Sequence, residues 1–263
     1  MSAVSQNIGE NISSNIQGLI IAGISLGGTP AFIPASWFAD LFGRKICVGL
    51  GSAIMVIASV IQIATDGCWP FLGTRIAIGV GLGFAQTAAP PLTTEIAHPR
   101  HRGTVTAVFQ ATWYWGAIVS ASVTLGAIYI SKSTWSWRVP CLLQCLFPAI
   151  QFLGLFIVPE SPRWLVSKGR QDEALDILAR YHANGDKSDP LVQFEFHEIR
   201  EAIELERTTA HKSGWASFVA TRGAFHRLAI AILVGVMIQW AGNGMPYFFS
   251  FSFLPTSTVS HWN

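Results

Sequence analysis

Acidic and basic side chains stand close together at three points of the sequence, each at the edge of a long apolar stretch. Asp40 precedes Arg44 by four residues, and Glu160 precedes Arg163 by three. Such groups can form ion pairs between helix ends, or they can cap helices and fix orientation in a membrane. Because acids are needed for pairing but not for orientation, we favour ion pairs. The set comprises Asp40, Arg44, Lys45, Glu95, Arg102, Glu160 and Arg163.

A second pattern places side-chain amides beside aromatic rings inside apolar stretches. Gln110, Trp113 and Tyr114 occur at i, i+3 and i+4, so they share one helix face. Near the carboxyl end, Gln239 and Asn243 share a face by the same rule. Such faces suit a ligand that offers hydroxyl groups to the amides and C–H groups to the rings. The alternative is a hydrogen bond between helices, worth roughly 0.6 kcal/mol in a membrane.

The other reactive residue types are not arranged for catalysis or metal binding. No Gly-rich loop is followed by Lys-Ser or Lys-Thr, and Ser161 has no His nearby in the sequence. His98 and His101 lie in a charged turn, where a zinc pair is disfavoured. Cys141 and Cys145 lie one helical turn apart in an apolar run and are interpreted as buried thiols. We therefore predict no enzyme, no cofactor and no metal site.

The elements that would position these residues are membrane-spanning helices. Charged residues make up 12% of the 263 residues, about half the ~25% usual in soluble proteins, and the mean hydropathy is +0.42. The 228–263 segment carries no Asp, Glu, Lys or Arg. A soluble domain needs charged surface everywhere, so we predict an all-α integral membrane protein in contact with a lipid bilayer.

A bilayer core of ~30 Å requires about 20 apolar residues in a helix. Six stretches meet this requirement: Gln17–Ala39, Ile46–Thr65, Cys68–Thr94, Thr104–Ile130, Val139–Val158 and Leu228–Leu254. Arg75 is the one charge inside them. A charge in hydrocarbon costs at least ~2.5 kcal/mol, so we expect Arg75 to face protein or water.

Lys and Arg are unevenly distributed between the loops, which sets the predicted orientation. Ten basic residues lie between Pro159 and Arg227, on the same side as Arg44 and Arg102. That side is predicted to be cytoplasmic, with both termini outside. The net charge is only +2, so nucleic acid is not a predicted partner.

The chain is accordingly divided into four segments. Residues 1–16 form an extracellular tail, 17–158 five membrane helices, 159–227 a cytoplasmic helical loop, and 228–263 a last helix with an outer tail. Within the loop we predict helices around 170–181 and 190–208. The second carries an apolar stripe at Val192, Phe196, Ile199 and Ile203. This stripe is expected to lie against the membrane domain, with a partner-docking surface as the alternative.

The order of several motifs resembles the sugar porter family of the major facilitator superfamily. The motifs are Arg75 followed by Gly79, Gly81 and Gly83; Glu95-Ile-Ala-His-Pro99; Trp137-Arg-Val-Pro140; and Pro159-Glu-Ser-Pro-Arg-Trp-Leu165. The last run is the most specific of them. Tyr181-His-Ala-Asn-Gly185 and Gln239-Trp-Ala-Gly-Asn-Gly244 are most similar to fungal hexose and lactose permease-like members.

The resemblance implies twelve spans in two six-helix bundles, with the substrate bound between the bundles. The six predicted spans match the family's second to seventh, so five belong to the N-terminal bundle and one to the C-terminal bundle. We therefore expect a partial fold of this superfamily, from an incomplete chain. The implied function is secondary transport of a hexose or disaccharide by alternating access in the plasma membrane, with proton symport and facilitated diffusion both open. The alternative is a non-transporting membrane protein, either sensor-like or an inactive truncated product.

The resemblance also implies roles for the residues singled out above. Gln110 matches a position where a glutamine binds sugar, and Gln239 matches one of a pair of such glutamines. Ile238 stands at the position of the second glutamine, and Asn243 is offset by one from the usual asparagine. We assign substrate binding to Gln110, Trp113, Gln239 and Asn243. The charged pairs would close the cytoplasmic side, and Arg75 is expected in the bundle interior.

Overall fold

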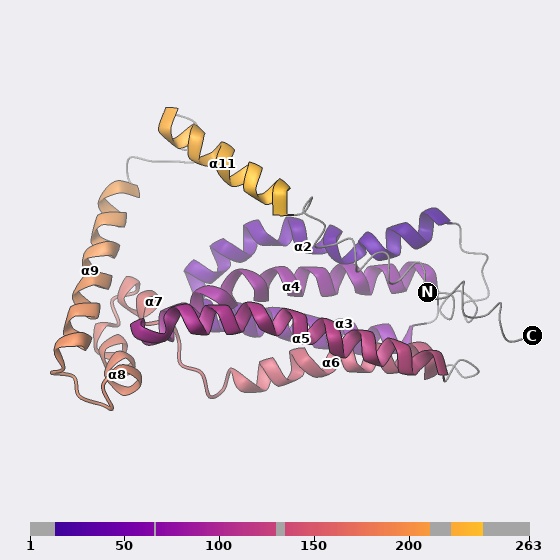
Figure 1. The fold of residues 1–263 in the computed structure, drawn as a ribbon, viewed down its shortest axis with the longest axis horizontal. Helices are drawn as coiled ribbons and strands as arrows, with labels where there is room; N and C mark the ends of the chain where they lie inside the picture. The colour runs from indigo at the N-terminus through magenta and orange to yellow at the C-terminus, as the bar shows by residue number, and fades with distance from the viewer. Residues whose placement is uncertain (1–13, 66, 130–134, 211–221, 239–263) are drawn as a thin grey trace, which may run out of the picture. The chain divides into compact units, whose positions relative to one another are not determined.

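The computed structural model describes residues 14–65, 67–129, 135–210 and 222–238, and these residues contain helices and no strands. The helices are α2 (Ser14–Phe42), α3 (Arg44–Ala64), α4 (Cys68–Ile96), η1 (Pro99–His101), α5 (Arg102–Tyr129), α6 (Trp135–Gly154), α7 (Pro162–Ser167), α8 (Gln171–His182), α9 (Pro190–Ala210) and α11 (Arg222–Ile238). They form two compact units that divide between Glu201 and Ala202. The first unit holds the bundle of α2 to α6 (Figure 1).

Within the described residues, three helices are long and apolar enough to cross a membrane. These are the Gly18–Phe42 part of α2, the whole of α3 and the whole of α4. They coincide with the first three predicted spans. Helix α5 has 28 residues, about 42 Å of helix, but its Gln, Trp and Tyr residues make it less apolar. Length and apolar composition therefore support the first three predicted spans, and the fourth to sixth stay predictions.

Glycines bring the backbones of the first three helices into contact. A Cβ atom on Gly79 of α4 would lie 2.1 Å from the carbonyl oxygen of Ile24 in α2. A Cβ atom on Gly51 of α3 would lie 2.5 Å from the carbonyl oxygen of Gly81 in α4. Helix α4 therefore packs tightly between α2 and α3, while α6 packs on α3. Close approach of this kind is how membrane helices gain packing energy without a hydrophobic driving force.

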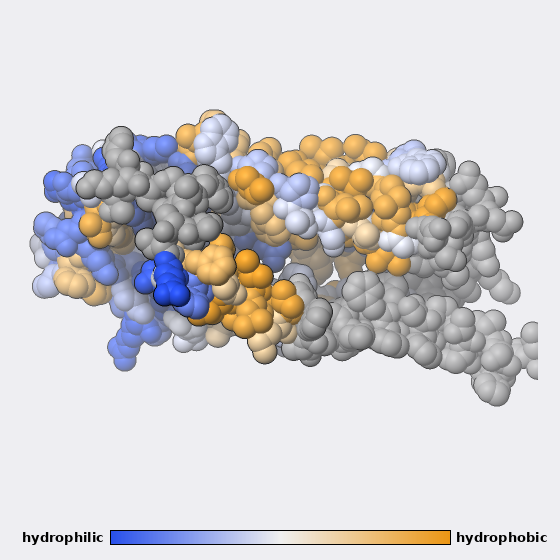
Figure 2. Space-filling view, turned by 90° about the horizontal axis from the view of Figure 1, so that it is seen from above, coloured by the Kyte–Doolittle hydropathy of each residue, from blue (hydrophilic) through white to orange (hydrophobic). Residues whose placement is uncertain are grey.

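The outer surface of this bundle is apolar. Large side chains such as Ile33, Ile57, Trp69 and Leu153 are exposed along its helices. Figure 2 shows apolar side chains over the bundle and hydrophilic ones gathered at the end where α7 and α8 lie. A contiguous apolar surface of this extent suits lipid rather than water. Cys141 is buried, as predicted, whereas Cys145 is only partly buried.

The segment after α6 folds into helices α7, α8 and α9, of 6, 12 and 21 residues. Helix α8 ends at His182, where the N–H of Gly185 donates to the carbonyl oxygen of Ala179 at 2.8 Å and Gly185 takes a φ of 97°. This is a glycine-terminated helix end of the kind that the sequence predicts. Val192 of α9 is buried together with Leu178 and Ala179 of α8, and Phe196 and Ile199 pack on them. This part of the predicted stripe therefore joins the two loop helices to each other.

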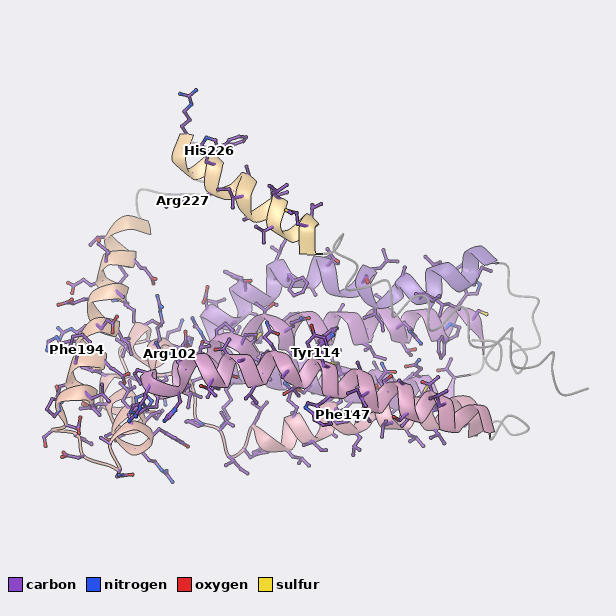
Figure 3. The ribbon with its side chains drawn as sticks, viewed as in Figure 1. Arg102, Tyr114, Phe147, Phe194, His226 and Arg227 are labelled. Carbon is purple, nitrogen blue, oxygen red and sulfur yellow. The ribbon has the colours of Figure 1, made fainter. Side chains whose placement is uncertain are left out.

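The second unit contains the end of α9 and helix α11. The first turns of α11 carry Arg222, His226 and Arg227, two of which are labelled in Figure 3. After Arg227 the described part of α11 is wholly apolar, and Ile230 and Leu233 are exposed. This arrangement fits a helix that begins in water and continues into lipid.

Candidate functional site

The turn between α2 and α3 depends on Gly43. Its φ is +108°, a conformation that side chains other than glycine rarely adopt. A Cβ atom here would also lie 2.4 Å from Oε2 of Glu160. Glycine thus permits both the sharp turn and the close approach of an acidic side chain.

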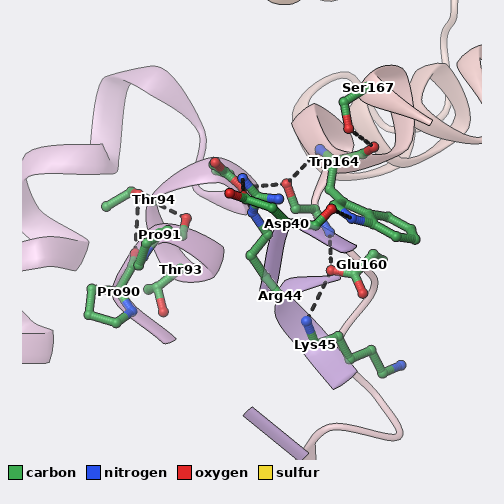
Figure 4. Close-up of polar contacts among 12 residues, drawn as sticks. Asp40, Arg44, Lys45, Pro90, Pro91, Thr93, Thr94, Glu160, Trp164 and Ser167 are labelled. Atoms are coloured by element: carbon green, nitrogen blue, oxygen red, sulfur yellow. Dashed lines mark hydrogen bonds and ion pairs between the residues drawn. The ribbon is translucent and has the colours of Figure 1, made fainter. Parts of the chain in front are cut away.

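Glu160 caps the first turn of α3 from a distant part of the chain. Its Oε1 accepts hydrogen bonds from the backbone N–H groups of Lys45 and Ser161, each at 3.0 Å. Gly43, the residue before α3, has no side chain that could cap the helix. A carboxylate satisfies an unpaired N–H there and interacts favourably with the helix dipole. Glu160 therefore ties the end of the α6 segment to the start of α3 (Figure 4).

Arg44 joins the ends of α2 and α4. One guanidinium nitrogen lies 3.5 Å from the carboxylate of Asp40, and Nε lies 3.7 Å from Oε2 of Glu95. The Asp40 side chain is 73% exposed and that of Glu95 only 19%. Exposed ion pairs contribute little free energy, so the contact with Glu95 is the more important of the two.

Ser161 and Trp164 attach α7 to the same helix ends. The hydroxyl of buried Ser161 donates to Oε2 of Glu95 and accepts from the backbone N–H of Trp164 at 3.2 Å. The indole N–H of Trp164 donates to the carbonyl oxygen of Asp40 at 3.1 Å. Glu95 thus receives a hydrogen bond and a cation at once, which holds its carboxylate in one place. We call Asp40, Arg44, Glu95, Glu160, Ser161 and Trp164 the helix-end network (Figure 4).

The structure brings together most of the charged residues that the sequence singles out. Lys45 takes part through its backbone N–H. Arg163 is the second residue of α7 and is half-buried. Arg102 begins α5 and is exposed, and it is not one of the residues in these contacts (Figure 3).

The predicted binding residues are only partly described. Gln110, Trp113 and Tyr114 lie along α5 and are exposed, with Trp113 and Tyr114 each 60% accessible. Tyr114 lies near the middle of the helix (Figure 3). Gln239 and Asn243 lie outside the described residues. The structure therefore places one of the two predicted binding surfaces, on a face of α5 that the described helices leave open.

Arg75 lies on the side of α4 that meets α2. A Cβ atom on Gly23 of α2 would lie 3.2 Å from the Cβ of Arg75. The guanidinium group lies over the ring of Phe71, 5.4 Å from its centre. Its Nε is buried, and within the described part of the chain it has no hydrogen-bond partner. The cation–π contact offsets part of the cost of placing this cation among apolar helices.

A family model described as "Sugar (and other) transporter" matches residues 2–260. The chain belongs to this family.

Two fungal members of the sugar transporter family are similar in sequence to most of this chain. It is 31% identical to the MFS glucose transporter mfs1 of Aspergillus flavus over 240 residues, which cover 88% of this chain and 45% of that protein. It is 33% identical to hexose transporter HXT10 of Saccharomyces cerevisiae over 238 residues, which cover 89% of this chain and 42% of that protein. The chain thus spans about half the length of the curated relatives that it matches.

Solved structures of a sugar transporter confirm the fold of this chain. The proton:xylose symporter XylE, bound to 6-bromo-6-deoxy-D-glucose, superposes with a TM-score of 0.72 at 21% identity, covering 84% of this chain and 50% of XylE. An inward-open form of the xylose transporter XylE from E. coli gives a TM-score of 0.62. The predicted all-α fold of the major facilitator superfamily is therefore correct.

Two members of the helix-end network were not predicted individually. Both belong to the Pro159–Leu165 motif, and the sequence predicts a contact for neither of them. Ser161 followed by Pro162 is nevertheless a typical start signal, with a serine as N-cap and a proline in the first turn. That signal predicts the beginning of α7, although it does not predict that Ser161 also binds Glu95.

Proposed function

We propose that this protein is a secondary membrane carrier that moves a hexose by alternating access. The observation that carries the proposal is the helix-end network, which joins α2, α3, α4 and α7 through Arg44, Glu95 and Glu160. Contacts of this kind can form and break as a unit when helices tilt, and alternating access needs such a change at one membrane face. Membership of the sugar transporter family supports the same function.

The choice of substrate rests on relatives and on α5. Both fungal relatives described above carry glucose or hexose transport in their names. Gln110 and Trp113 stand on the open face of α5, where an amide could bind sugar hydroxyls and an indole could stack on a sugar ring. We propose that these two residues, with Gln239 and Asn243 of the next bundle, contact the sugar.

The orientation follows the distribution of Lys and Arg. We propose that the helix-end network, α7, α8 and α9 face the cytoplasm, and that the network closes this side when the carrier faces outward. The plasma membrane is the proposed location. XylE is described as a proton:xylose symporter, which makes proton coupling one way to drive this carrier. Facilitated diffusion is the other, and uptake with and without a proton gradient distinguishes the two. The protein is proposed to act as a transporter and not as an enzyme.

Uptake in a host that lacks its own hexose transporters tests this function. The complete reading frame that encodes the chain is expressed, and uptake of labelled D-glucose is compared with that of L-glucose. We expect saturable uptake of the D form, at least tenfold above the L form, because a built site discriminates the positions of hydroxyl groups. Uptake equal to that of the empty host, with the protein present in the membrane, would favour a non-transporting membrane protein instead.

A further inference from the structure

A buried histidine connects α8, α9 and the end of α4. The His182 side chain is 2% exposed, and its Nδ1 lies 2.6 Å from Oε2 of Glu195 in α9. Its Nε2 lies 3.1 Å from the carbonyl oxygen of Ile96, the last residue of α4. All three residues belong to the same compact unit.

The contacts of His182 with Ile96 and with Glu195 together require two protons on the His182–Glu195 pair. A carbonyl oxygen only accepts hydrogen bonds, so Nε2 must carry a hydrogen to bond Ile96. The contact between Nδ1 and Glu195 needs a second proton, either on the ring or on the carboxyl group. If one proton is lost, the remaining N–H stays with the carboxylate, because a charge-assisted hydrogen bond is the stronger of the two. Nε2 then presents a lone pair to the Ile96 oxygen, and this contact is lost.

The surroundings of His182 define what else can affect this proton. Glu195 faces it from α9, with a side chain only 8% exposed and an Oε1 that has no partner among the described residues. From the turn after α4, the ring of His98 meets His182 edge to face, 5.3 Å away. His98 itself accepts from the backbone N–H of Arg100, and His101 lies beyond it at 5.9 Å. A positive charge on His98 would oppose the charge on His182.

The segment of α4 that His182 holds is adjacent to a weak point of the helix. Pro90 and Pro91 lack the N–H groups that would bond the preceding turn. The hydroxyl of Thr94 also donates back to the carbonyl oxygens of these two prolines, at 3.1 and 2.9 Å, a contact that tends to bend a helix further (Figure 4). Helices bend at such points. The turn that follows carries Glu95 of the helix-end network and Ile96 together, so a force on Ile96 also moves Glu95.

We propose that His182 is a positioning residue that fixes the end of α4, and with it Glu95, only while the His182–Glu195 pair holds both protons. Alkaline conditions in the cytoplasm would release the end of α4 and leave α8 attached to α9. The inference rests on the proposed function, since the position of Glu95 affects transport only if the protein is a carrier.

Hydrogen exchange and uptake are measured on the protein from its complete reading frame, in wild type and in two variants. His182→Gln removes the ring, and Glu195→Gln keeps the ring but replaces the carboxylate by an uncharged amide. His197→Gln, an exposed histidine on α9, is the matched control. Exchange of the amides at 95–101 and at 175–200 is followed at about pH 6 and about pH 8.5, a range that covers histidine titration, after correction for intrinsic rates.

In wild type we expect protection of 95–101 to fall about tenfold at the higher pH, while that of 175–200 changes less than twofold. In Glu195→Gln the amide N–H can donate to Nδ1 and leave the hydrogen on Nε2 for Ile96, so protection of 95–101 should stay high at both pH values. The uptake of either variant should lose the dependence on cytoplasmic pH that wild type and His197→Gln show. Equal protection of 95–101 at both pH values in wild type would overturn the proposal. If protection changes as expected but no variant or wild type takes up sugar, the positioning contact stands and the proposed function fails.

Discussion

Replacing Gly79 by alanine is expected to reduce the yield of folded protein at least tenfold. The added Cβ would lie 2.1 Å from the carbonyl oxygen of Ile24 and 2.9 Å from the backbone nitrogen of Gly28. Both are backbone atoms of α2, so no side chain can move aside and the two helices must separate. Overpacking costs about 1–3 kcal/mol even where side chains can adjust. The monodisperse fraction in size-exclusion chromatography of a fluorescent fusion measures the effect.

Gly73 provides the matched control for this substitution. It lies in the same helix, and a Cβ atom there would meet nothing within 4 Å. Gly73→Ala should therefore leave the monodisperse fraction unchanged, since alanine also favours a helix more than glycine does. Equal behaviour of the two variants would show that α2 and α4 are not packed as described.

Replacing Glu160 by alanine is expected to lower sugar uptake at least tenfold at a similar amount of protein in the membrane. The change leaves the N–H groups of Lys45 and Ser161 without their acceptor. Hydrogen bonds to charged groups contribute about 1.5–3 kcal/mol each, so the first turn of α3 should separate from the start of α7. Initial uptake rates, normalised to surface labelling, give the result.

Two further substitutions show whether this effect is specific. Glu160→Gln keeps an acceptor oxygen but loses the charge, so uptake should fall to an intermediate level. Glu173→Ala removes an acid whose partner is the exposed Arg170 on the surface of α8, and uptake should stay at the wild-type level because exposed pairs contribute little. Normal uptake in Glu160→Ala would reduce Glu160 to a dispensable helix cap.

Much of the bundle could be predicted from the sequence because membrane helices are encoded locally. Runs of about 20 apolar residues predicted α2, α3 and α4. The pairing of Asp40 with Arg44 is also local in sequence, because the two residues stand on either side of the turn at Gly43, one at the end of α2 and the other at the start of α3. Helix α7 has six residues, too few for a periodic pattern, so only its start signal at Ser161 and Pro162 is visible in the sequence.

The contacts that build the site could not be predicted in the same way. Glu160 and Lys45 are 115 residues apart, and Ser161 and Glu95 are 66 apart. Whether such side chains meet depends on how closely α2, α3 and α4 pack, which the glycines decide through backbone contact. His182 was part of a family motif in the sequence, but its two partners come from α9 and α4. A single sequence does not show which helix ends will lie together.

Counterflow in proteoliposomes tests the central claim, that this protein is a carrier working by alternating access. Protein from the complete reading frame is reconstituted, the vesicles are loaded with unlabelled D-glucose, and labelled D-glucose is supplied outside at low concentration. A carrier exchanges the sugars one for one, so we predict that the label rises transiently above its equilibrium level, and that vesicles loaded with L-glucose show no such rise. A label that only approaches equilibrium, or that never enters, in vesicles shown to contain the folded protein would contradict the account.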